Sequence, residues 1–212
     1  MDRFPVRRIY CVGQNYADHA REMGSDPGRM PPFFFMKPAD AVVPSGSRLN
    51  FPPRTAQLHH EVELVIALGG GGSQIRPEAV SDIIYGWAVG LDMTRRDLQS
   101  EAKKSGRPWD MAKGFDESAP LGMLEKSAPP VAAVISLSVN GEPRQDGNIA
   151  DMIWTVPEIV ATLSTYVTLA AGDLIFTGTP AGVGPVRPGD VIIGRIEGAA
   201  PVEVSYLPAS GS

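Results

Sequence analysis

The 212-residue sequence is poor in cysteine, histidine and aromatic residues. Its one cysteine, Cys11, excludes an intramolecular disulfide framework and any metal site built from several cysteines. Nineteen basic residues against 24 acidic ones give a net charge of −5, so the basic surface that nucleic acid requires is missing. The N-terminal residues have no apolar signal core, and no run of about 18 apolar residues is present. We therefore expect a cytoplasmic protein that binds neither nucleic acid nor a membrane.

Glycine and proline, by contrast, are abundant, with 23 and 20 residues. This composition favours many turns between short strands over long helices. The length is that of one domain over residues 1–212. The four consecutive glycines at 69–72 predict a flexible loop tip inside that domain.

Hydrophobic patterns predict several short strands and three helices. The strands are expected at 33–36, 41–43, 61–68, 87–91, 135–139, 174–177 and 191–196, and the helices at 15–24, 94–104 and 155–167. Asn140-Gly141 is typical of a type I′ hairpin turn, and Thr155 with Glu158 matches a capping box. Residues 25–32 contain three prolines, which predict a mobile polar loop.

Three carboxylates are the most informative candidates for a functional site. Glu61 and Glu63 lie two residues apart on a predicted strand, so both project from one face, and Asp92 ends another strand. Mg²⁺ and Mn²⁺ prefer such oxygen ligands. Alternating glutamates are also common on solvated strands, but Val65 continues this face and argues against uniform solvation.

Two histidines directly precede these glutamates. His59 and His60 do not form the HExxH pattern of zinc metalloproteases. We interpret both as structural or supporting residues and not as metal ligands.

A histidine and a glutamate form a second candidate group. His19 and Glu22 are three residues apart on a predicted helix, where a carboxylate can orient an imidazole and raise its basicity. Such a pair can act as a general base toward water, although it is also a common surface pair. Its position beside the 25–32 loop suits a lid that closes over substrate.

Cationic and polar side chains follow Asp92. Arg96 and Gln99 share a helix face that can present a guanidinium and an amide to a carboxylate-bearing substrate. Lys103 and Lys104 further along are equally well explained by a solvated helix face.

Lys113 differs from these lysines because Trp109, Met111 and Phe115 surround it in the sequence. Such apolar neighbours predict a partly buried ammonium group that needs an anionic partner. Thr179 lies in the glycine-rich segment 177–184, which either offers hydrogen-bond donors to an oxyanion or is an ordinary turn.

Together these segments resemble the fumarylacetoacetate hydrolase family from about Ile9 to Ile196. The segments that carry the resemblance occur in family order and are VGQNYADH at 12–19, Lys37-Pro38, HHEVE at 59–63, GLDMTRRD at 90–97, Trp109 to Phe115, and TGTP at 177–180. The resemblance implies an α+β, predominantly β fold of mixed rolled sheets with few short helices. It also implies a homodimer that holds Mg²⁺ or Mn²⁺.

The resemblance further implies a role for each candidate residue. Glu61, Glu63 and Asp92 would bind the metal, His19 and Glu22 would form a catalytic dyad, Lys113 would be an electrostatic catalyst, and Arg96, Gln99 and Thr179 would contact substrate or oxyanion. One position departs from the pattern, since Gln14 stands where related sequences often carry arginine. This departure weakens the expectation of a doubly anionic substrate.

The implied reaction is the metal-dependent hydrolysis of a carbon–carbon bond in a small 2,4-diketo acid. The foremost expected substrate is fumarylpyruvate, which would give fumarate and pyruvate in aromatic (gentisate-type) degradation. Hydrolysis of another acylpyruvate, decarboxylation of oxaloacetate and isomerisation of a 2-oxo acid are alternatives that use the same metal ligands. A non-catalytic metal-binding protein is the alternative from a different class.

Overall fold

The computed structural model describes residues 4–24 and 30–209. The helices are α1 (Ala17–Glu22), α2 (Arg96–Ser105), α3 (Asp110–Lys113) and α4 (Val156–Tyr166), with 3₁₀ turns at Ala39–Ala41, Pro77–Ile83 and Ile149–Asp151. The strands are β1 (Arg8–Gly13), β2 (Phe33–Lys37), β3 (Val42–Pro44), β4 (Ser47–Leu49), β5 (Leu58–His60), β6 (Val62–Leu68), β7 (Ile84–Leu91), β8 (Thr94–Arg95), β9 (Ala119–Leu121), β10 (Val134–Val139), β11 (Glu142–Asn148), β12 (Asp173–Phe176), β13 (Gly184–Val186), β14 (Val191–Ile196) and β15 (Val202–Tyr206). The fold is predominantly β with few short helices, as predicted.

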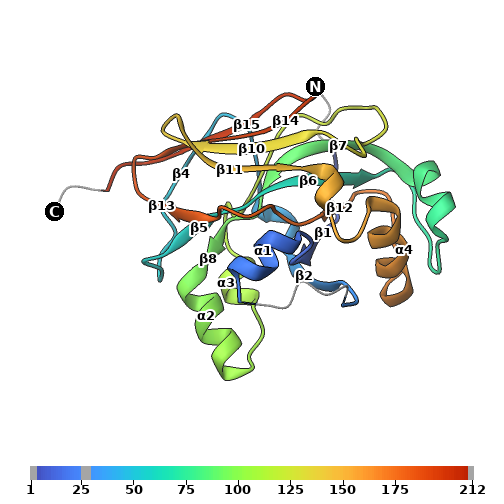
Figure 1. Cartoon of the computed structure of the whole chain (residues 1–212), viewed down its shortest axis with the longest axis horizontal. Coiled ribbons are helices and arrows are strands. Elements are labelled where there is room, and N and C mark those ends of the chain that lie inside the picture. The colour runs from blue at the N-terminus through green and yellow to red at the C-terminus, as the bar shows by residue number, and fades with distance from the viewer. Residues whose placement is uncertain (1–3, 25–29, 210–212) are drawn as a thin grey trace.

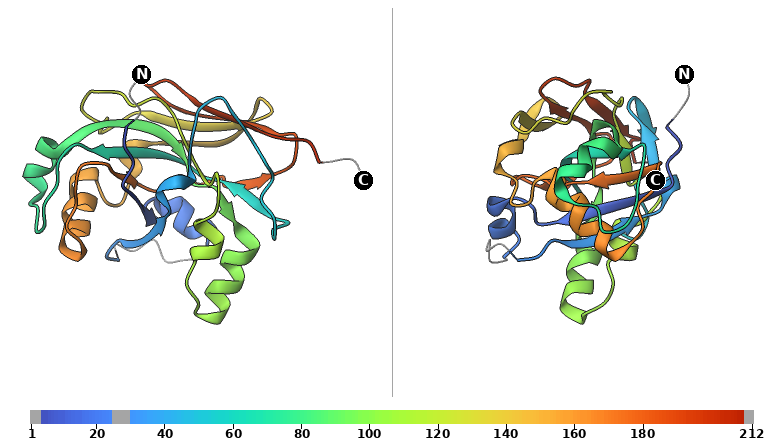
Figure 2. Two further views of the ribbon diagram at one scale, coloured as in Figure 1. Left: turned by 180° about the vertical axis from the view of Figure 1, so that it is seen from behind. Right: turned by 90° about the vertical axis from the view of Figure 1, so that its right-hand side faces the viewer.

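The described residues form three mixed or antiparallel sheets. The largest has the strand order β2-β1-β12-β6-β7-β9-β3, and β1 runs parallel to β12 while β12, β6 and β7 alternate in direction. A second sheet, β11-β10-β14-β15-β4, lies over the long curved strands β6 and β7, and the helices lie on the other side (Figures 1 and 2). A small sheet, β13-β5-β8, extends beside them. The rolled arrangement of mixed sheets is confirmed.

Strand β6 is buried over its whole length because apolar layers cover both of its faces. Val62 and Leu64 belong to the larger core, which also contains side chains of β10 and β14. Val65 belongs to the smaller core, which also contains Phe176 of the neighbouring strand β12. A strand buried on both sides explains why the glutamates of this segment are not solvated.

Several local predictions are confirmed at the expected positions. Asn140 and Gly141 both have positive φ, 53° and 83°, as a type I′ turn requires. Thr155 and Glu158 form the predicted capping box, and the main-chain N–H of Thr155 donates to Glu158 at 3.0 Å.

Several local predictions need correction. The helix expected at 15–24 spans only Ala17–Glu22, and the strand expected at 87–91 already begins at Ile84. The helix expected at 94–104 begins only at Arg96, because Thr94 and Arg95 pair with β5. The glycines at 69–72 are not a flexible tip: Gly72 exchanges main-chain hydrogen bonds with Leu169, and a Cβ on Gly71 would lie 2.0 Å from the Leu169 oxygen. Glycine is needed at position 71 because the segment at Leu169 approaches closely.

The predicted loop at 25–32 falls largely outside the described residues, and only 30–32 can be placed, without regular structure. No helix in the described part of the chain is long and apolar enough to cross a membrane.

Candidate active site

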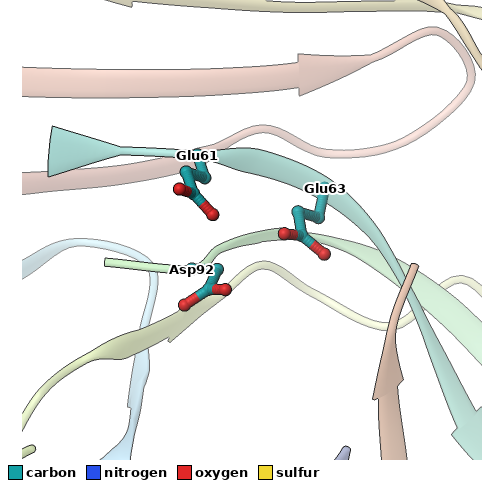
Figure 3. Close-up of side chains that lie close together, drawn as sticks. All are labelled: Glu61, Glu63 and Asp92. Atoms are coloured by element: carbon teal, nitrogen blue, oxygen red, sulfur yellow. The ribbon is translucent and has the colours of Figure 1, made fainter. Parts of the chain in front are cut away.

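The pairing of β6 with β7 brings the three predicted carboxylates together. Glu61 directly precedes β6, Glu63 is its second residue, and Asp92 directly follows β7. The Asp92 N–H donates to the Glu61 carbonyl at 2.9 Å, which extends the ladder to the site. One oxygen of each carboxylate lies within 4.8 Å of the other two, and the three side chains lie close together (Figure 3). All three residues are buried.

Two lysines and an arginine partly compensate these charges. Lys113 Nζ donates to Glu61 Oε2 at 2.8 Å and to Asp92 Oδ2 at 2.7 Å, so the buried ammonium group has the anionic partners that its sequence context predicts. Lys37 Nζ lies 2.8 Å from Asp92 Oδ1, and the Arg96 guanidinium pairs with Glu61 Oε1. Burial alone would raise the pKa of Glu61, but the charges of Lys113 and Arg96 hold it well below its usual value.

Glu63 lacks such compensation. No ion pair reaches it from any residue within 4–24 and 30–209. Its Oε2 accepts the main-chain N–H of Gly178 at 2.7 Å. Burial and the neighbouring charges of Asp92 and Glu61 raise the pKa of Glu63 well above its usual value. A hard oxygen donor set with one uncompensated carboxylate fits a divalent cation.

The loop after β12 delivers Gly178 to this position through a tight contact with Asn15. Gly178 has a φ of 98°, and a Cβ there would lie 2.6 Å from the Asn15 Cβ, so only glycine is accommodated. The fully buried Asn15 amide donates to the carbonyls of Thr177 and Trp154 at 2.8 and 2.9 Å. Asn15 therefore fixes the loop beside Glu63.

His19 and Glu22 form the contact that their spacing predicts. His19 Nδ1 lies 3.2 Å from Glu22 Oε2, and the Glu22 carboxylate also accepts the Gly182 N–H at 3.2 Å. The His19 side chain is buried, and burial lowers the pKa of its imidazole. The structure therefore presents a neutral, oriented imidazole, which is the protonation state of a general base.

Arg96 and Gln99 lie on the face of α2 that points to the carboxylates. Arg96 Nη1 donates to Gln99 Oε1 at 2.6 Å, and its Nε approaches His59 Nδ1 at 3.4 Å. Burial and the Arg96 charge lower the pKa of His59 to about 4. His59 therefore contacts a cation and not the carboxylate centre, in agreement with its interpretation as a supporting residue.

Thr179 is held by a buried amide that the sequence pattern does not reveal. Gln145 Nε2 donates to Thr179 Oγ1 at 2.8 Å and to the Pro180 carbonyl at 2.9 Å. Its Oε1 lies 3.0 Å from His60 Nδ1 and accepts the Val62 N–H at 3.1 Å. His60 is thus a partner of Gln145 and supports the site indirectly.

One pocket joins most of the predicted site residues. Its lining includes His19, Glu61, Glu63, Arg96, Gln99, Lys113 and Thr179. Asp92 lies beneath the pocket, and Glu22 lies behind His19. Gln14, Phe33, Phe35, Lys103 and Trp109 complete the walls.

Sequence reasoning missed two buried residues of this assembly, Lys37 and Gln145. Lys37 directly follows the predicted apolar strand at 33–36 and ends β2 in the structure, and a lysine in that position is a signal for a buried ion pair. Gln145 stands among the exposed polar residues of β11 and gives no comparable signal.

The chain is predominantly β and buries three neighbouring carboxylates beside a histidine–glutamate pair. This combination is typical of enzymes that bind a divalent metal and act on small polar substrates. The sequence profile described as Fumarylacetoacetate (FAA) hydrolase C-terminal matches residues 8–205. The chain belongs to the fumarylacetoacetate hydrolase family, which confirms the resemblance found in the sequence.

Individual relatives carry more than one activity in their names. The chain is 46% identical over 179 residues to the fumarylpyruvate hydrolase of a Ralstonia species, covering 84% of this chain and 93% of that protein. It is also 46% identical over 195 residues to the mitochondrial oxaloacetate tautomerase FAHD1 of Mus musculus, covering 91% and 88%.

Among solved structures, the fumarylpyruvate hydrolase of Pseudomonas aeruginosa in complex with Mn²⁺ and pyruvate superposes with a TM-score of 0.94 at 52% identity. The match covers 99% of this chain and 93% of that one.

Proposed function

We propose that the protein hydrolyses the carbon–carbon bond between C3 and C4 of a 2,4-diketo acid, and that fumarylpyruvate is its substrate. The observation that carries this proposal is the buried carboxylate triad, two members of which line one pocket with His19, the partner of Glu22. The names of the Ralstonia and Pseudomonas relatives support fumarylpyruvate over other acylpyruvates.

Glu61, Glu63 and Asp92 would hold a Mg²⁺ or Mn²⁺ ion. That ion would supply Lewis-acid polarisation and orientation of the 2-oxo acid end of the substrate. The Mn²⁺ and pyruvate of the Pseudomonas structure support this role, because pyruvate is the expected product of that end.

His19 is the proposed general base. Its buried imidazole is neutral, and Glu22 fixes the ring through Nδ1, so Nε2 is left to accept a proton. In the proposed reaction Nε2 takes a proton from water as the water oxygen bonds to C4. Glu22 stabilises the resulting imidazolium.

Lys113, Gln99 and Thr179 are the proposed donors to the oxyanion that develops on the C4 oxygen. An ammonium group has three N–H donors, and the contacts of Lys113 with Glu61 and Asp92 use two of them. Collapse of the oxyanion breaks the C3–C4 bond and leaves fumarate as the acid product. The electron pair passes to C3, which accepts the proton carried by His19 and so completes pyruvate.

Tautomerisation of oxaloacetate is a second candidate, supported by the name of the Mus musculus relative at the same 46% identity. It uses the same metal ligands and moves a proton between carbon and oxygen without consuming water. Both reactions need a base, and His19 oriented by Glu22 could serve either one. The names of the Ralstonia and Pseudomonas relatives favour hydrolysis.

The test compares substrates on one preparation. The purified protein is freed of metal with a chelator and reloaded with Mg²⁺ or Mn²⁺, and the ultraviolet absorbance of fumarylpyruvate is followed beside that of acetylpyruvate and oxaloacetate. We expect metal-dependent cleavage, fastest on fumarylpyruvate, with fumarate and pyruvate formed in equal amounts. Preference for oxaloacetate, or no cleavage of a diketo acid, would reject the proposed reaction.

We also propose that the protein is a homodimer, as its family membership suggests. Light scattering coupled to size-exclusion chromatography would test this directly, and a monomer mass would reject it.

A further inference from the structure

One face of α2 carries three side chains to the pocket, and only Gln99 has a role in the proposed reaction. Arg96, Gln99 and Lys103 are separated by three and four residues, so they lie along one side of the helix. All three line the pocket, whereas the next residue, Lys104, is not part of the lining. The structure therefore separates two lysines that the sequence leaves equivalent.

Lys103 is held above an aromatic wall. Its ammonium nitrogen lies 5.1 Å from the centre of the Trp109 ring, within the range of a cation–π contact. Phe33 meets the same indole edge-on at 5.4 Å, and Phe35 lies 5.8 Å from it. The three rings are tilted against one another and form an apolar side of the pocket, with the Lys103 ammonium group at its edge.

Lys103 also differs from the other pocket cations in its charge balance. Arg96 and Lys113 both pair with Glu61, but Lys103 forms no ion pair with any residue that the structure describes. Lys103 is exposed at the rim of the pocket. Partial desolvation and the charges of Arg96 and Lys113 lower its pKa, while the charge of Glu61 raises it, so Lys103 lies within the electrostatic reach of the site. A cation that lies at the rim of a pocket without an ion pair attracts an anionic ligand group.

The proposed substrate carries an anionic group, the distal carboxylate, at its acyl end. Its 2-oxo acid end is assigned to the carboxylate centre, so its acyl end extends away from that centre toward the pocket walls. A planar unsaturated acyl chain packs well on flat aromatic rings. A carboxylate at the end of that chain would meet a cation at the edge of the wall.

We propose that Lys103 binds the distal carboxylate of a dicarboxylic acylpyruvate and so selects doubly anionic substrates over singly anionic ones. This inference rests on the proposed function and defines its substrate class. It also accounts for Gln14, which lines the same pocket: a doubly anionic substrate needs no cation at position 14 when α2 provides one.

The test measures a specificity ratio, kcat/KM for fumarylpyruvate divided by kcat/KM for acetylpyruvate, which carries a methyl group in place of the unsaturated acid. Lys103→Met keeps the aliphatic stem over Trp109 but removes the charge. We expect the ratio to fall about tenfold, the effect of one hydrogen bond to a charged group. Lys103→Arg should restore the ratio because a guanidinium also stacks on indole and binds carboxylates.

Lys104→Met is the matched control, since it removes the same charge from the adjacent residue outside the pocket. The ratio should be unchanged in this variant. An unchanged ratio in Lys103→Met, or an equal fall in Lys104→Met, would overturn the inference.

A binding measurement separates failure of this inference from failure of the proposed function. Calorimetric titration of the Mn²⁺-loaded protein compares fumarate with crotonate, which has a methyl group in place of one carboxylate. The wild type should bind fumarate more tightly, and Lys103→Met should remove the difference. If the wild type cleaves no diketo acid, the proposed function fails while this comparison still tests Lys103. Equal affinities for both ligands in the wild type would reject the assignment of Lys103.

Discussion

Gln145 donates an amide N–H to the hydroxyl oxygen of Thr179 at 2.8 Å. Because the Thr179 hydroxyl oxygen accepts this hydrogen bond from Gln145, the Thr179 hydroxyl proton can be donated to a different partner. Thr179 lines the pocket, so its proton can be donated to an anionic oxygen of the substrate. Gln145 is by this geometry a positioning residue, which acts through Thr179.

Thr179→Val should lower kcat/KM for the diketo acid by roughly tenfold to a hundredfold, because it removes a donor to a charged oxygen while preserving the side-chain shape. Gln145→Leu should lower kcat/KM similarly and should also cost about 1–3 kcal/mol of unfolding free energy, since it leaves the Val62 N–H without its acceptor. Steady-state kinetics and urea unfolding measure the two effects.

The double variant provides the control for this pair. If Gln145 acts through Thr179, combining the substitutions should reduce kcat/KM little further than Thr179→Val alone. Fully additive losses would show that the two residues act independently.

Glu63→Gln should abolish most metal binding without weakening the metal-free fold. Glu63 is buried without a paired cation, and its raised pKa means that the charged form is disfavoured in the folded protein. An amide removes that unfavourable charge but also removes a ligand. We expect Mn²⁺ to raise the melting temperature of the wild type and to have little effect on Glu63→Gln. An equal rise in both proteins would exclude Glu63 as a ligand.

His19→Ala should reduce kcat by about 10²- to 10⁴-fold, the usual contribution of a general base. Because burial lowers the pKa of His19, the imidazole stays unprotonated to a lower pH than an exposed histidine. The acid limb of the kcat profile should therefore lie below pH 6.5, the ordinary value for histidine. Full activity in His19→Ala would reject the role of His19 as general base. Comparing the pH–rate profiles of the wild type and Glu22→Gln would show whether the Glu22 carboxylate sets the pH of the acid limb.

Stability of the metal-free protein should fall as the pH drops from about 6.5 to 4. The pKa of His59 is lowered to about 4, so between these values the unfolded chain binds more protons than the folded one. The stabilising effect of neutral His59 is complete above pH 6.5 and is lost on acidification through this window. His59→Asn keeps an acceptor for Arg96 but does not titrate, so its urea midpoint should fall less between pH 7 and pH 5. An identical fall would assign the effect to other groups.

The parts of the fold that could be predicted are those with local causes. The turn at Asn140-Gly141 needs only two residues that tolerate positive φ, and the capping box needs only Thr155 and Glu158. The same holds for the carboxylate site. Glu61 and Glu63 share a face because strand side chains alternate, and Asp92 ends the neighbouring strand.

The parts that could not be predicted depend on contacts between distant segments. Gln145 reaches Val62 across 83 residues, and nothing in the local pattern of β11 marks it as buried. Lys37 reaches the Met93 carbonyl across 56 residues. The local pattern at 69–72 predicts a flexible tip, because the close approach of Leu169 to Gly71 involves a residue about 100 positions further along the chain. The roles of the site residues likewise came from family resemblance and not from spacing.

The order of strands in the largest sheet has a consequence for biosynthesis. The strands that carry the three carboxylates are consecutive in the sequence, but Gly178, which donates to Glu63, follows it by 115 residues. A nascent chain thus exposes the acidic residues long before the ribosome releases the strand that shelters them. The carboxylate site is complete only when β12 has inserted between β1 and β6. A metal ion that binds before this step would have fewer and weaker contacts.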